Sequence, residues 1–163
     1  MRKQKPLDTY EAVKEKALRL LEFRSHSEKE LSFKLTHYGA SDEHIERTLD
    51  FCRRYGFVND ESYAIAKASD LIKLKKYGLR RVRAELKSKG IPDDLIENAL
   101  MSLDTENEEN VLKELVRKKL RGDFSDKNKD KCLRYFVYRG YDIYDIKDAI
   151  DTCAERSDYT DEF

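Results

Sequence analysis

Basic side chains are concentrated in one stretch of the sequence, residues 73–90, which contains eight Lys or Arg residues and a single Glu. Fixed positive charge at this density can neutralise phosphates or carboxylates on a partner. Six of these bases are the candidates for such a contact: Lys73, Lys76, Arg80, Arg81, Arg83 and Lys87. Three interpretations are open, namely a phosphate-binding stripe, a docking face for a protein, and a solvated helix surface.

The residue types that most often carry catalysis or bind metals are few and widely spaced. They are Cys52, Cys132, Cys153, His26, His37 and His44. No Cys-x-x-Cys pair, Gly-rich phosphate loop, nucleophile elbow or HExxH motif gives them the spacing of a known kind of site. We therefore expect no catalytic residue, no metal and no cofactor. The thiols replace core aliphatic residues and are expected to be buried and free, and the histidines are expected at the surface.

Helical spacing separates an apolar face from a basic face within the basic stretch. Leu79, Val82 and Leu86 recur at intervals of three and four residues, so we expect them to face inward. The bases then project outward, and among them Arg81 has an acid, Glu85, four residues further on for an ion pair. The other bases have no acid within their own predicted helix, so this face can meet a partner.

Positive and negative charge alternate along the chain, although the formal net charge is zero. Residues 91–110 contain seven acids and no base, and residues 142–163 contain eight acids and two bases. Between these two acidic stretches the chain is basic again, at Arg117, Lys118, Lys119 and Arg121. Such bands fit a partner that carries both signs of charge, for example a protein already bound to nucleic acid.

Three glycines divide the sequence into repeats. Gly39, Gly90 and Gly140 lie 51 and 50 residues apart. Apolar residues recur at four fixed distances from these glycines: Leu31, Val82 and Cys132; Leu35, Leu86 and Phe136; Ile45, Ile96 and Ile146; Leu49, Leu100 and Ile150. Each repeat is interpreted as helix, glycine, helix, because a glycine adopts the left-handed conformation that ends a helix without a Cβ penalty.

A third amphipathic segment precedes each helix pair, over roughly residues 9–22, 60–76 and 108–121. The predicted fold is therefore all-α, with three tandem three-helix units stacked into a curved, elongated array. The predicted boundaries are a leader at 1–8, repeats at 9–56, 57–104 and 105–154, and an acidic tail at 155–163. The second repeat is basic and is expected to be the main binding unit.

Local signals mark where some of these helices begin. Asp8 with Glu11, and Ser27 with Glu30, have the spacing of a capping box, in which each end of the pair satisfies a backbone N–H group of the first turn. The acidic residues 104–110 are the expected flexible joint.

Composition indicates a thin-cored protein outside the membrane. Hydrophobic residues make up 39% of the chain and charged residues 40%. No stretch has the apolar run of a signal peptide or a membrane span. We expect a soluble, cytoplasmic, monomeric protein without membrane contact.

The order and spacing of several of these elements resemble a known family. The sequence LEFRSHSEKELSFKLTHYGASDEHIERTLDFCRRYGFVNDESYA, followed by KYGLRRVRAELKSKGIPDDLIENAL, resembles the bacterial RecX family of recombination regulators. The elements that carry the resemblance are Arg24, Ser25, Ser27, Glu30 and Leu31, then Gly56, Asn59 and Asp60, then Gly78 and the run from Arg81 through Leu86 to Gly90 and Ile91. The resemblance spans about residues 10–154.

This resemblance implies both a fold and a function. The fold is a series of tandem three-helix repeats, in agreement with the periodicity above. The function is that of a non-enzymatic regulator that binds the RecA recombinase in the helical groove of its filament on single-stranded DNA. Such a regulator restrains the ATPase, recombinase and coprotease activities in DNA repair, recombination and the SOS response. The six bases named at the outset are then the expected contact surface.

Two other hypotheses remain open from the residues. One is a helical-repeat protein that binds nucleic acid directly through its phosphates without a recombinase, and the other is a scaffold for a different protein partner. Sequence-specific reading of DNA is disfavoured, because the last helices of the second and third repeats are acidic. The aromatic residues of the third repeat either pack or contact a partner: Tyr135, Phe136, Tyr138, Tyr141 and Tyr144.

Overall fold

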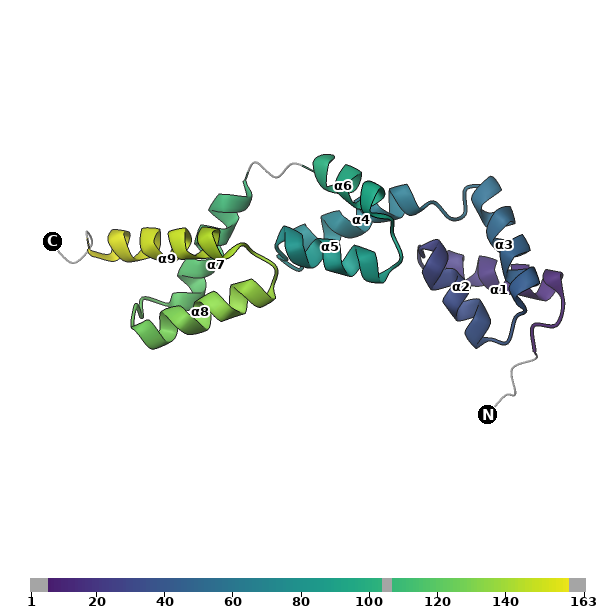
Figure 1. The fold of residues 1–163 in the computed structure, drawn as a ribbon, viewed down its shortest axis with the longest axis horizontal. Coiled ribbons are helices and arrows are strands. Elements are labelled where there is room, and N and C mark those ends of the chain that lie inside the picture. The colour runs from purple at the N-terminus through teal and green to yellow at the C-terminus, as the bar shows by residue number, and fades with distance from the viewer. Residues whose placement is uncertain (1–5, 104–106, 159–163) are drawn as a thin grey trace. The chain divides into compact units, whose positions relative to one another are not determined.

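The computed structural model describes residues 6–103 and 107–158. All regular secondary structure in these two ranges is α-helical, so the predicted fold class is confirmed. The helices are α1 (Tyr10–Phe23), α2 (Glu28–His37), α3 (Asp42–Arg54), α4 (Asp60–Lys73), α5 (Leu79–Ser88), α6 (Asp93–Met101), α7 (Glu108–Leu120), α8 (Asp126–Tyr138) and α9 (Ile143–Asp158) (Figure 1). None of these helices combines the length and the apolar character that crossing a membrane requires.

The chain forms two compact units. Unit 1 consists of Met1–Lys67 and Leu86–Ala99, and unit 2 consists of Ala68–Glu85 and Leu100–Phe163. Helices α4, α5 and α6 each contribute residues to both units. The middle repeat is therefore divided between the units, and the repeat boundaries predicted from the sequence stay a prediction.

The predicted repeat register is confirmed by burial. All twelve apolar residues at the four fixed distances from the glycines are buried, with none more than 7% exposed. Gly39, Gly90 and Gly140 have φ angles of 84°, 77° and 96°, which is the left-handed region that favours glycine. The spacing of glycine and apolar residues therefore located both the helix ends and the core positions.

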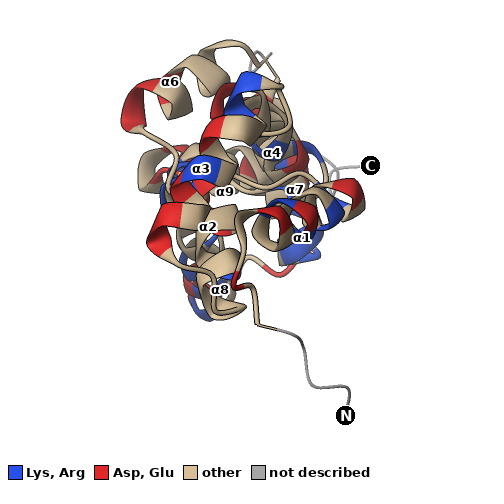
Figure 2. Cartoon of the chain, turned by 90° about the vertical axis from the view of Figure 1, so that its right-hand side faces the viewer, with Lys and Arg blue, Asp and Glu red and all other residues tan. Residues whose placement is uncertain are grey.

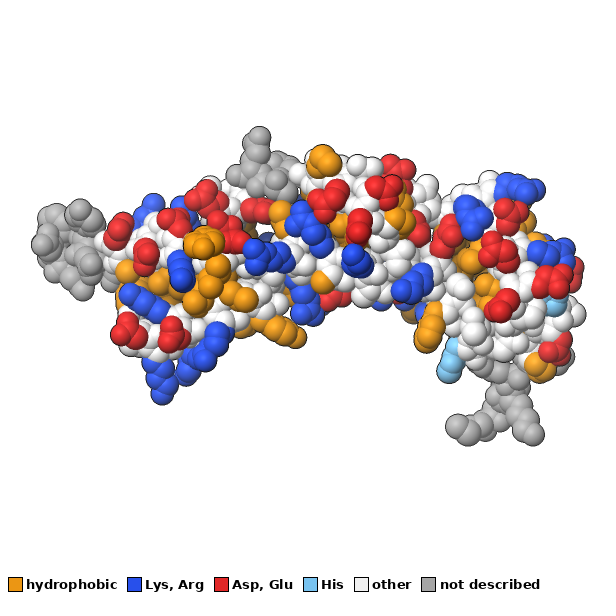
Figure 3. Space-filling model, in the orientation of Figure 1, with side chains coloured by type: hydrophobic (Ala, Val, Ile, Leu, Met, Phe, Trp, Pro, Cys, Tyr) orange, Lys and Arg blue, Asp and Glu red, His pale blue; other side chains and the backbone are white. Residues whose placement is uncertain are grey.

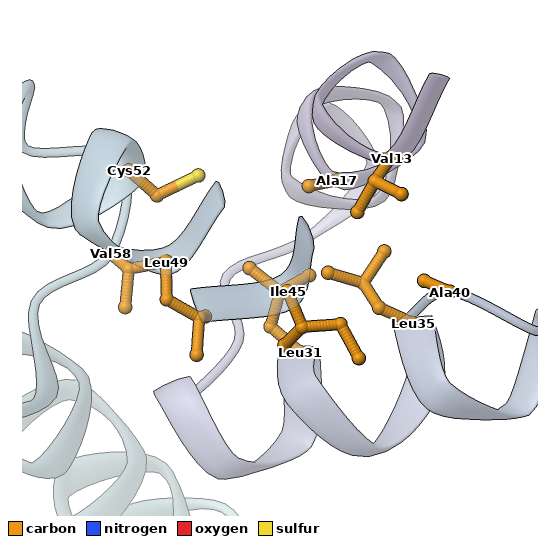
Figure 4. Close-up of a cluster of buried hydrophobic side chains, with 9 residues drawn as sticks. All are labelled: Val13, Ala17, Leu31, Leu35, Ala40, Ile45, Leu49, Cys52 and Val58. Carbon is orange, nitrogen blue, oxygen red and sulfur yellow. The ribbon is translucent and has the colours of Figure 1, made fainter. Parts of the chain in front are cut away.

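Unit 1 is built around a core formed by its first three helices. Val13 of α1 points toward Leu31 and Leu35 of α2, and Ile45 of α3 lies beside them (Figure 4). Each of these side chains is at most 4% exposed. Full burial of a side chain of this size contributes roughly 1.5–3 kcal/mol to stability, so this core holds the first repeat together.

Unit 2 has a corresponding core between α7, α8 and α9. Val116 of α7, Phe136 of α8 and Ile146 of α9 are buried in one cluster. Phe136 also packs edge to face against Tyr135 and Tyr141, with ring centroids 5.0 and 5.8 Å apart. Because Phe136 fills a core position between these tyrosines, the aromatic residues of the third repeat serve packing at least in part.

The two predicted capping boxes have different outcomes. At the start of α2, Ser27 accepts a hydrogen bond from the backbone N–H of Glu30, and the Glu30 side chain accepts one from the backbone N–H of Ser27. This box is confirmed. The prediction at Asp8 is wrong, because Thr9 is the residue that caps α1, by accepting from the N–H of Ala12 at 3.2 Å. The helix therefore starts one residue later than the predicted box, and its cap satisfies the N–H of Ala12 instead of that of Glu11.

In unit 1 the start of α2 meets the end of α5. The Ser27 hydroxyl donates to the carbonyl oxygen of Lys89 at 2.6 Å, and the Lys89 ammonium lies 2.8 Å from the Glu30 carboxylate. Gly90 lies directly against the side chain of Lys29: a Cβ atom at position 90 would come within 2.3 Å of it. The first and second repeats are joined here.

Glu30 is the centre of the polar cluster at this joint. Its carboxylate accepts hydrogen bonds from Arg24, from Lys89 and from the Tyr63 hydroxyl, and its side chain is only 13% exposed. Burial alone would raise the pKa of Glu30, but the hydrogen bonds from Lys89 and Arg24 outweigh it and lower that pKa to about 2. The charged form of Glu30 is therefore strongly favoured in the folded protein.

In unit 2 the start of α5 meets the end of α8. The backbone N–H of Gly78 donates to the carbonyl of Arg139 at 2.9 Å, and the N–H of Arg80 donates to the carbonyl of Gly140 at 3.2 Å. The two glycines are in direct contact, since a Cβ on Gly78 would lie 2.4 Å from the Gly140 oxygen. N–H groups that the first turn of α5 leaves unpaired are thus satisfied by carbonyls that α8 leaves unpaired.

The two joints use equivalent positions of the repeat. Ser27 and Gly78 each lie twelve residues before the glycine of their own repeat, and Lys89 and Arg139 each lie one residue before the next glycine. The first joint is made by a side-chain hydroxyl and the second by the backbone. The repeat pattern therefore extends from the cores to the contacts between successive repeats.

Two predicted segments lie partly outside the described residues. Of the expected joint at 104–110, residues 104–106 are outside them, and the remainder leads into α7. Of the predicted leader and tail, residues 1–5 and 159–163 are outside them, while α9 continues to Asp158.

Replacing Gly140 with alanine should destabilise the protein more than replacing Gly39. Both glycines have a left-handed backbone, which costs a non-glycine residue about 1–2 kcal/mol. Only at Gly140 would the new Cβ collide, 2.3 Å from the backbone nitrogen of Arg81, whereas nothing lies within 4 Å of a Cβ at position 39. We expect Gly140→Ala to lose at least about 1 kcal/mol more than Gly39→Ala in urea unfolding followed by circular dichroism. Equal losses would contradict the close packing of this joint.

Acid should weaken the wild-type protein more than a Glu30→Gln variant. The pKa of Glu30 is about 2 in the folded protein against an ordinary value of 4.5. Its carboxylate therefore adds stability that is complete above pH 4.5 and is lost as the pH falls toward 2. We expect the difference in unfolding free energy between the two proteins to shrink by up to about 3 kcal/mol between pH 6 and pH 2.5.

The matched control for this experiment is Glu15→Gln. Glu15 forms an ion pair with Arg19, but both side chains are more than 60% exposed, and such pairs contribute little to stability. The wild-type protein and the control should therefore respond to acid alike. A pH response of Glu30→Gln that matches this control would contradict the role given to Glu30.

Candidate functional site

The thiols do not come together into a reactive or metal-binding group. Cys52 and Cys132 are buried, as predicted, whereas Cys153 is half-buried, so that part of the prediction is wrong. Burial raises the pKa of all three thiols, which keeps them protonated and unreactive. Among the described residues no group of three or more His, Cys, Asp and Glu side chains could hold a metal ion.

The expectation that the histidines lie at the surface is wrong for His26. This residue is only 2% exposed. Its Nδ1 donates to the carbonyl of Arg24 at 2.8 Å, and its Nε2 accepts from the Lys34 ammonium at 2.9 Å. Burial lowers the pKa of His26, and the charges of Arg24 and Lys34 lower it further. His26 is therefore a neutral structural residue beside the first joint.

Helix α5 separates its faces as the sequence predicted. It starts directly after Gly78 and ends at Ser88, two residues before Gly90, whose N–H donates to the carbonyl of Lys87. Val82 and Leu86 are fully buried, and Leu79 is half-buried. The apolar stripe fixes the rotation of the helix, so the basic side chains between these residues must face outward or sideways.

The six predicted contact residues differ in exposure. Four are exposed: Lys73, Lys76, Arg80 and Lys87. Arg81 and Arg83 are half-buried. The sequence therefore overestimated how far two of the arginines project.

Acidic residues outside α5 pair with its bases. Arg80 forms an ion pair with Asp142, at the start of α9, and Lys87 lies 3.2 Å from Asp93, in the first turn of α6, which appears red in Figure 2. Arg81 pairs with Glu85 at 2.9 Å, as its spacing predicted. The first two acids lie outside α5, so no spacing rule within that helix could have found them.

Arg83 affects the start of α7. Burial raises the pKa of Glu108, the first residue of that helix, and the positive charge of Arg83 partly offsets this effect. Arg83 thus acts at least partly within unit 2, where it stabilises the charged form of a partly buried carboxylate.

Arg81 also lies against aromatic rings that the sequence did not connect with it. Its guanidinium is 5.3 Å from the ring centre of Tyr77 and 5.1 Å from that of Tyr138. Arg139 faces the same Tyr77 ring at 4.9 Å. These cation–π contacts fix the directions of both guanidinium groups at the second joint.

The last two candidates are Lys73, at the end of α4, and Lys76, in the segment that joins α4 to α5. Lys76 has a φ angle of 55°, which is a left-handed conformation that side chains other than glycine seldom adopt. Its carbonyl oxygen accepts a hydrogen bond from the Tyr141 hydroxyl at 2.9 Å. Lys73, Lys76 and Tyr77 also line a hollow of about 280 Å³ with Val111 of α7 and Tyr141. The third repeat therefore holds this segment in its bent shape.

Arg139 is a basic residue beside Lys76 that the sequence did not predict as part of this region. It lies at the end of α8, near Lys76, and both residues line a second hollow of about 250 Å³ in unit 2. The signal was present in the repeat register, because Arg139 occupies the position that Lys89 occupies in the repeat before it. Basic residues thus recur in the repeat as the apolar ones do.

Comparison with protein families identifies two segments of the chain. Residues 14–52 match the family model described as "RecX, first three-helix domain". Residues 59–100 match the one described as "RecX, second three-helix domain". These segments correspond closely to α1–α3 and α4–α6.

Whole-chain comparisons give the same result. The chain is 34% identical over 148 residues to "Regulatory protein RecX" of Clostridium perfringens (strain 13 / Type A), covering 88% of this chain and 68% of that protein. It is 32% identical over 141 residues to the protein of the same name from Vibrio vulnificus (strain CMCP6), covering 85% and 91%. The crystal structure of RecX from Lactobacillus salivarius superposes with a TM-score of 0.75 over 92% of this chain and 97% of that one, at 20% identity. The predicted tandem three-helix fold is thereby confirmed.

Proposed function

The chain belongs to the RecX family of regulatory proteins, and from this membership we propose that it binds the filament that the RecA recombinase forms on single-stranded DNA. In this proposal the protein lies in the helical groove of the filament and inhibits the ATPase, recombinase and coprotease activities without catalysing a reaction itself. It acts as a monomer in the cytoplasm, in DNA repair, recombination and the SOS response.

The observation that carries this proposal is the outward basic face of α5. Arg80 and Lys87 have side chains that are 66% and 70% exposed, although each has an acidic partner. Exposed ion pairs of this kind contribute only about 0–1 kcal/mol, so a carboxylate or phosphate of a partner can replace Asp142 or Asp93 at little cost. The face is therefore available for binding in spite of its internal pairs.

We assign the contact surface to the six bases predicted from the sequence, Lys73, Lys76, Arg80, Arg81, Arg83 and Lys87. The four exposed members meet the filament directly. The half-buried Arg81 and Arg83 contribute long-range attraction and hold their neighbours in place. A filament of protein on DNA presents both carboxylates and phosphates, and a basic face next to acidic helix starts is complementary to such a mixed surface.

The test is ATP hydrolysis by RecA on single-stranded DNA, titrated with this protein and with the triple variant Lys73→Gln/Arg80→Gln/Lys87→Gln. We expect the wild-type protein to suppress hydrolysis. Loss of three exposed charges should raise the concentration needed for half suppression by about tenfold, which corresponds to roughly 0.5 kcal/mol for each charge removed.

The control variant is Arg19→Gln/Arg54→Gln/Lys147→Gln, which removes the same charge from exposed residues of α1, α3 and α9. It should suppress hydrolysis as well as the wild-type protein does. Absence of suppression by the wild-type protein at saturation would overturn the proposed function. Equal suppression by the two triple variants would overturn the assignment of the surface.

A further inference from the structure

A hollow in unit 2 gathers bases around aromatic side chains. Its volume is about 250 Å³. It is lined by the segment before α5, by the last turns of α7 and by the end of α8, through Lys76, Leu115, Lys118, Lys119, Tyr135, Phe136 and Arg139. Four of these seven residues are basic and none is acidic, so the hollow has a strongly positive lining.

Three of the four bases have no acidic partner within residues 6–103 and 107–158. Lys76, Lys119 and Arg139 form no ion pair with any acidic side chain in the described part of the chain, and Lys118 has only an exposed contact with Glu114 at 3.4 Å. This distinguishes the hollow from the face of α5, where Arg80, Arg81 and Lys87 are paired. Bases that are not paired with acidic side chains of the protein attract an anion from solution.

Aromatic rings hold these cations in place. The Lys119 ammonium lies 3.9 Å from the ring centre of Tyr135, and the Arg139 guanidinium lies 5.5 Å from the same ring. Arg139 is also held over Tyr77 and donates to the backbone carbonyl of Lys75. Because their positions are already fixed, the two cations lose little conformational entropy when they bind an anion.

The backbone carbonyls at the end of α8 do not cancel this charge. Those of Arg139 and Gly140 accept hydrogen bonds from Gly78 and Arg80 of the second joint. The N–H groups of Gly78 and Arg80 therefore occupy these oxygen atoms. The side chain of Arg139 instead donates to the carbonyl of Lys75.

Exposed tyrosine rings adjoin the cations on α8. Tyr135 is 39% exposed and Tyr138 is 74% exposed, and their spacing of three residues places them on the same side of the helix. Apolar side chains gather over α8 and α9 on the face shown in Figure 3, with Lys and Arg side chains among them. Nucleobases stack on exposed aromatic rings only when they are unpaired, so rings beside cations are typical of surfaces that bind single strands.

We propose that this hollow binds the phosphate backbone of a single-stranded nucleic acid, with Lys118, Lys119, Arg139 and Lys76 against successive phosphates and the rings of Tyr135 and Tyr138 against neighbouring nucleobases. The site goes beyond the regulation proposed above, because it requires no recombinase. It gives the third repeat a binding role of its own, separate from the face of α5 except for Lys76.

The test is fluorescence anisotropy of a labelled oligothymidylate with the full chain and no recombinase, at salt concentrations from about 50 to about 200 mM. We expect binding by the wild-type protein that weakens with salt. Lys118→Gln/Lys119→Gln should weaken it about tenfold at low salt and reduce the log–log salt slope by about 1.4, or 0.7 for each phosphate that is no longer neutralised. Neither lysine takes part in a joint between repeats.

A matched control and a ring variant complete the experiment. Arg19→Gln/Lys147→Gln removes two exposed charges that do not line the hollow, so it should bind almost as the wild-type protein does. Tyr135→Leu should bind at least about fivefold more weakly, because it removes a stacking ring, whereas Tyr135→Phe should retain binding.

Four results would overturn this proposal: no binding by the wild-type protein, equal losses in the two double variants, tighter binding to a duplex of the same length, and displacement by an equal concentration of inorganic phosphate. Each can occur while RecA inhibition is intact. Conversely, a protein that binds the oligonucleotide but leaves RecA hydrolysis unchanged would overturn only the proposed function.

Discussion

The close contact between Gly78 and Gly140 is the constraint on which unit 2 depends. No side chain fits between these two backbones, and their approach lets the first turn of α5 donate to the last carbonyls of α8. This contact fixes the position of α5 relative to the third repeat, and it brings Arg80 to Asp142 and Arg81 to Tyr138. The basic residues are thus arranged by a backbone contact that contains no charge.

Much of this arrangement could be predicted from the sequence, because the buried apolar positions recur in each repeat. A buried column needs only an apolar residue at a fixed distance from a helix-ending glycine, and such columns are visible in a single sequence. The residues that carry the resemblance to the RecX family also have structural roles. Arg24, Ser27 and Glu30 build the first joint, and Gly78 builds the second. Several of the residues that carry the resemblance therefore connect one repeat to the next, and others, such as Leu31 and Leu86, belong to the cores.

The features that could not be predicted are pairings between distant segments. His26 is an exception, because its partners Arg24 and Lys34 are close in sequence, but polar neighbours gave no sign that it is buried. Arg80 finds its acid 62 residues away, and the hollow with Arg139 and Lys119 combines three separate segments. The spacing of apolar residues predicts which face of a helix is buried. It does not specify which other helix covers that face or which charged residues form pairs there.

The occupied start of α5 restricts how this protein can hold an anion. The N-terminus of a helix ordinarily offers free N–H groups and a favourable dipole to phosphate. Here two N–H groups at the start of α5 are bonded to α8, and at the start of α2 the N–H groups of Glu28 and Glu30 are bonded to Asp60 and Ser27. At these two helix starts a phosphate must then be met by side chains instead. Recognition of that kind depends on the charge of side chains rather than on a backbone cradle, so a strand can be bound without matching the fixed spacing of helix N–H groups.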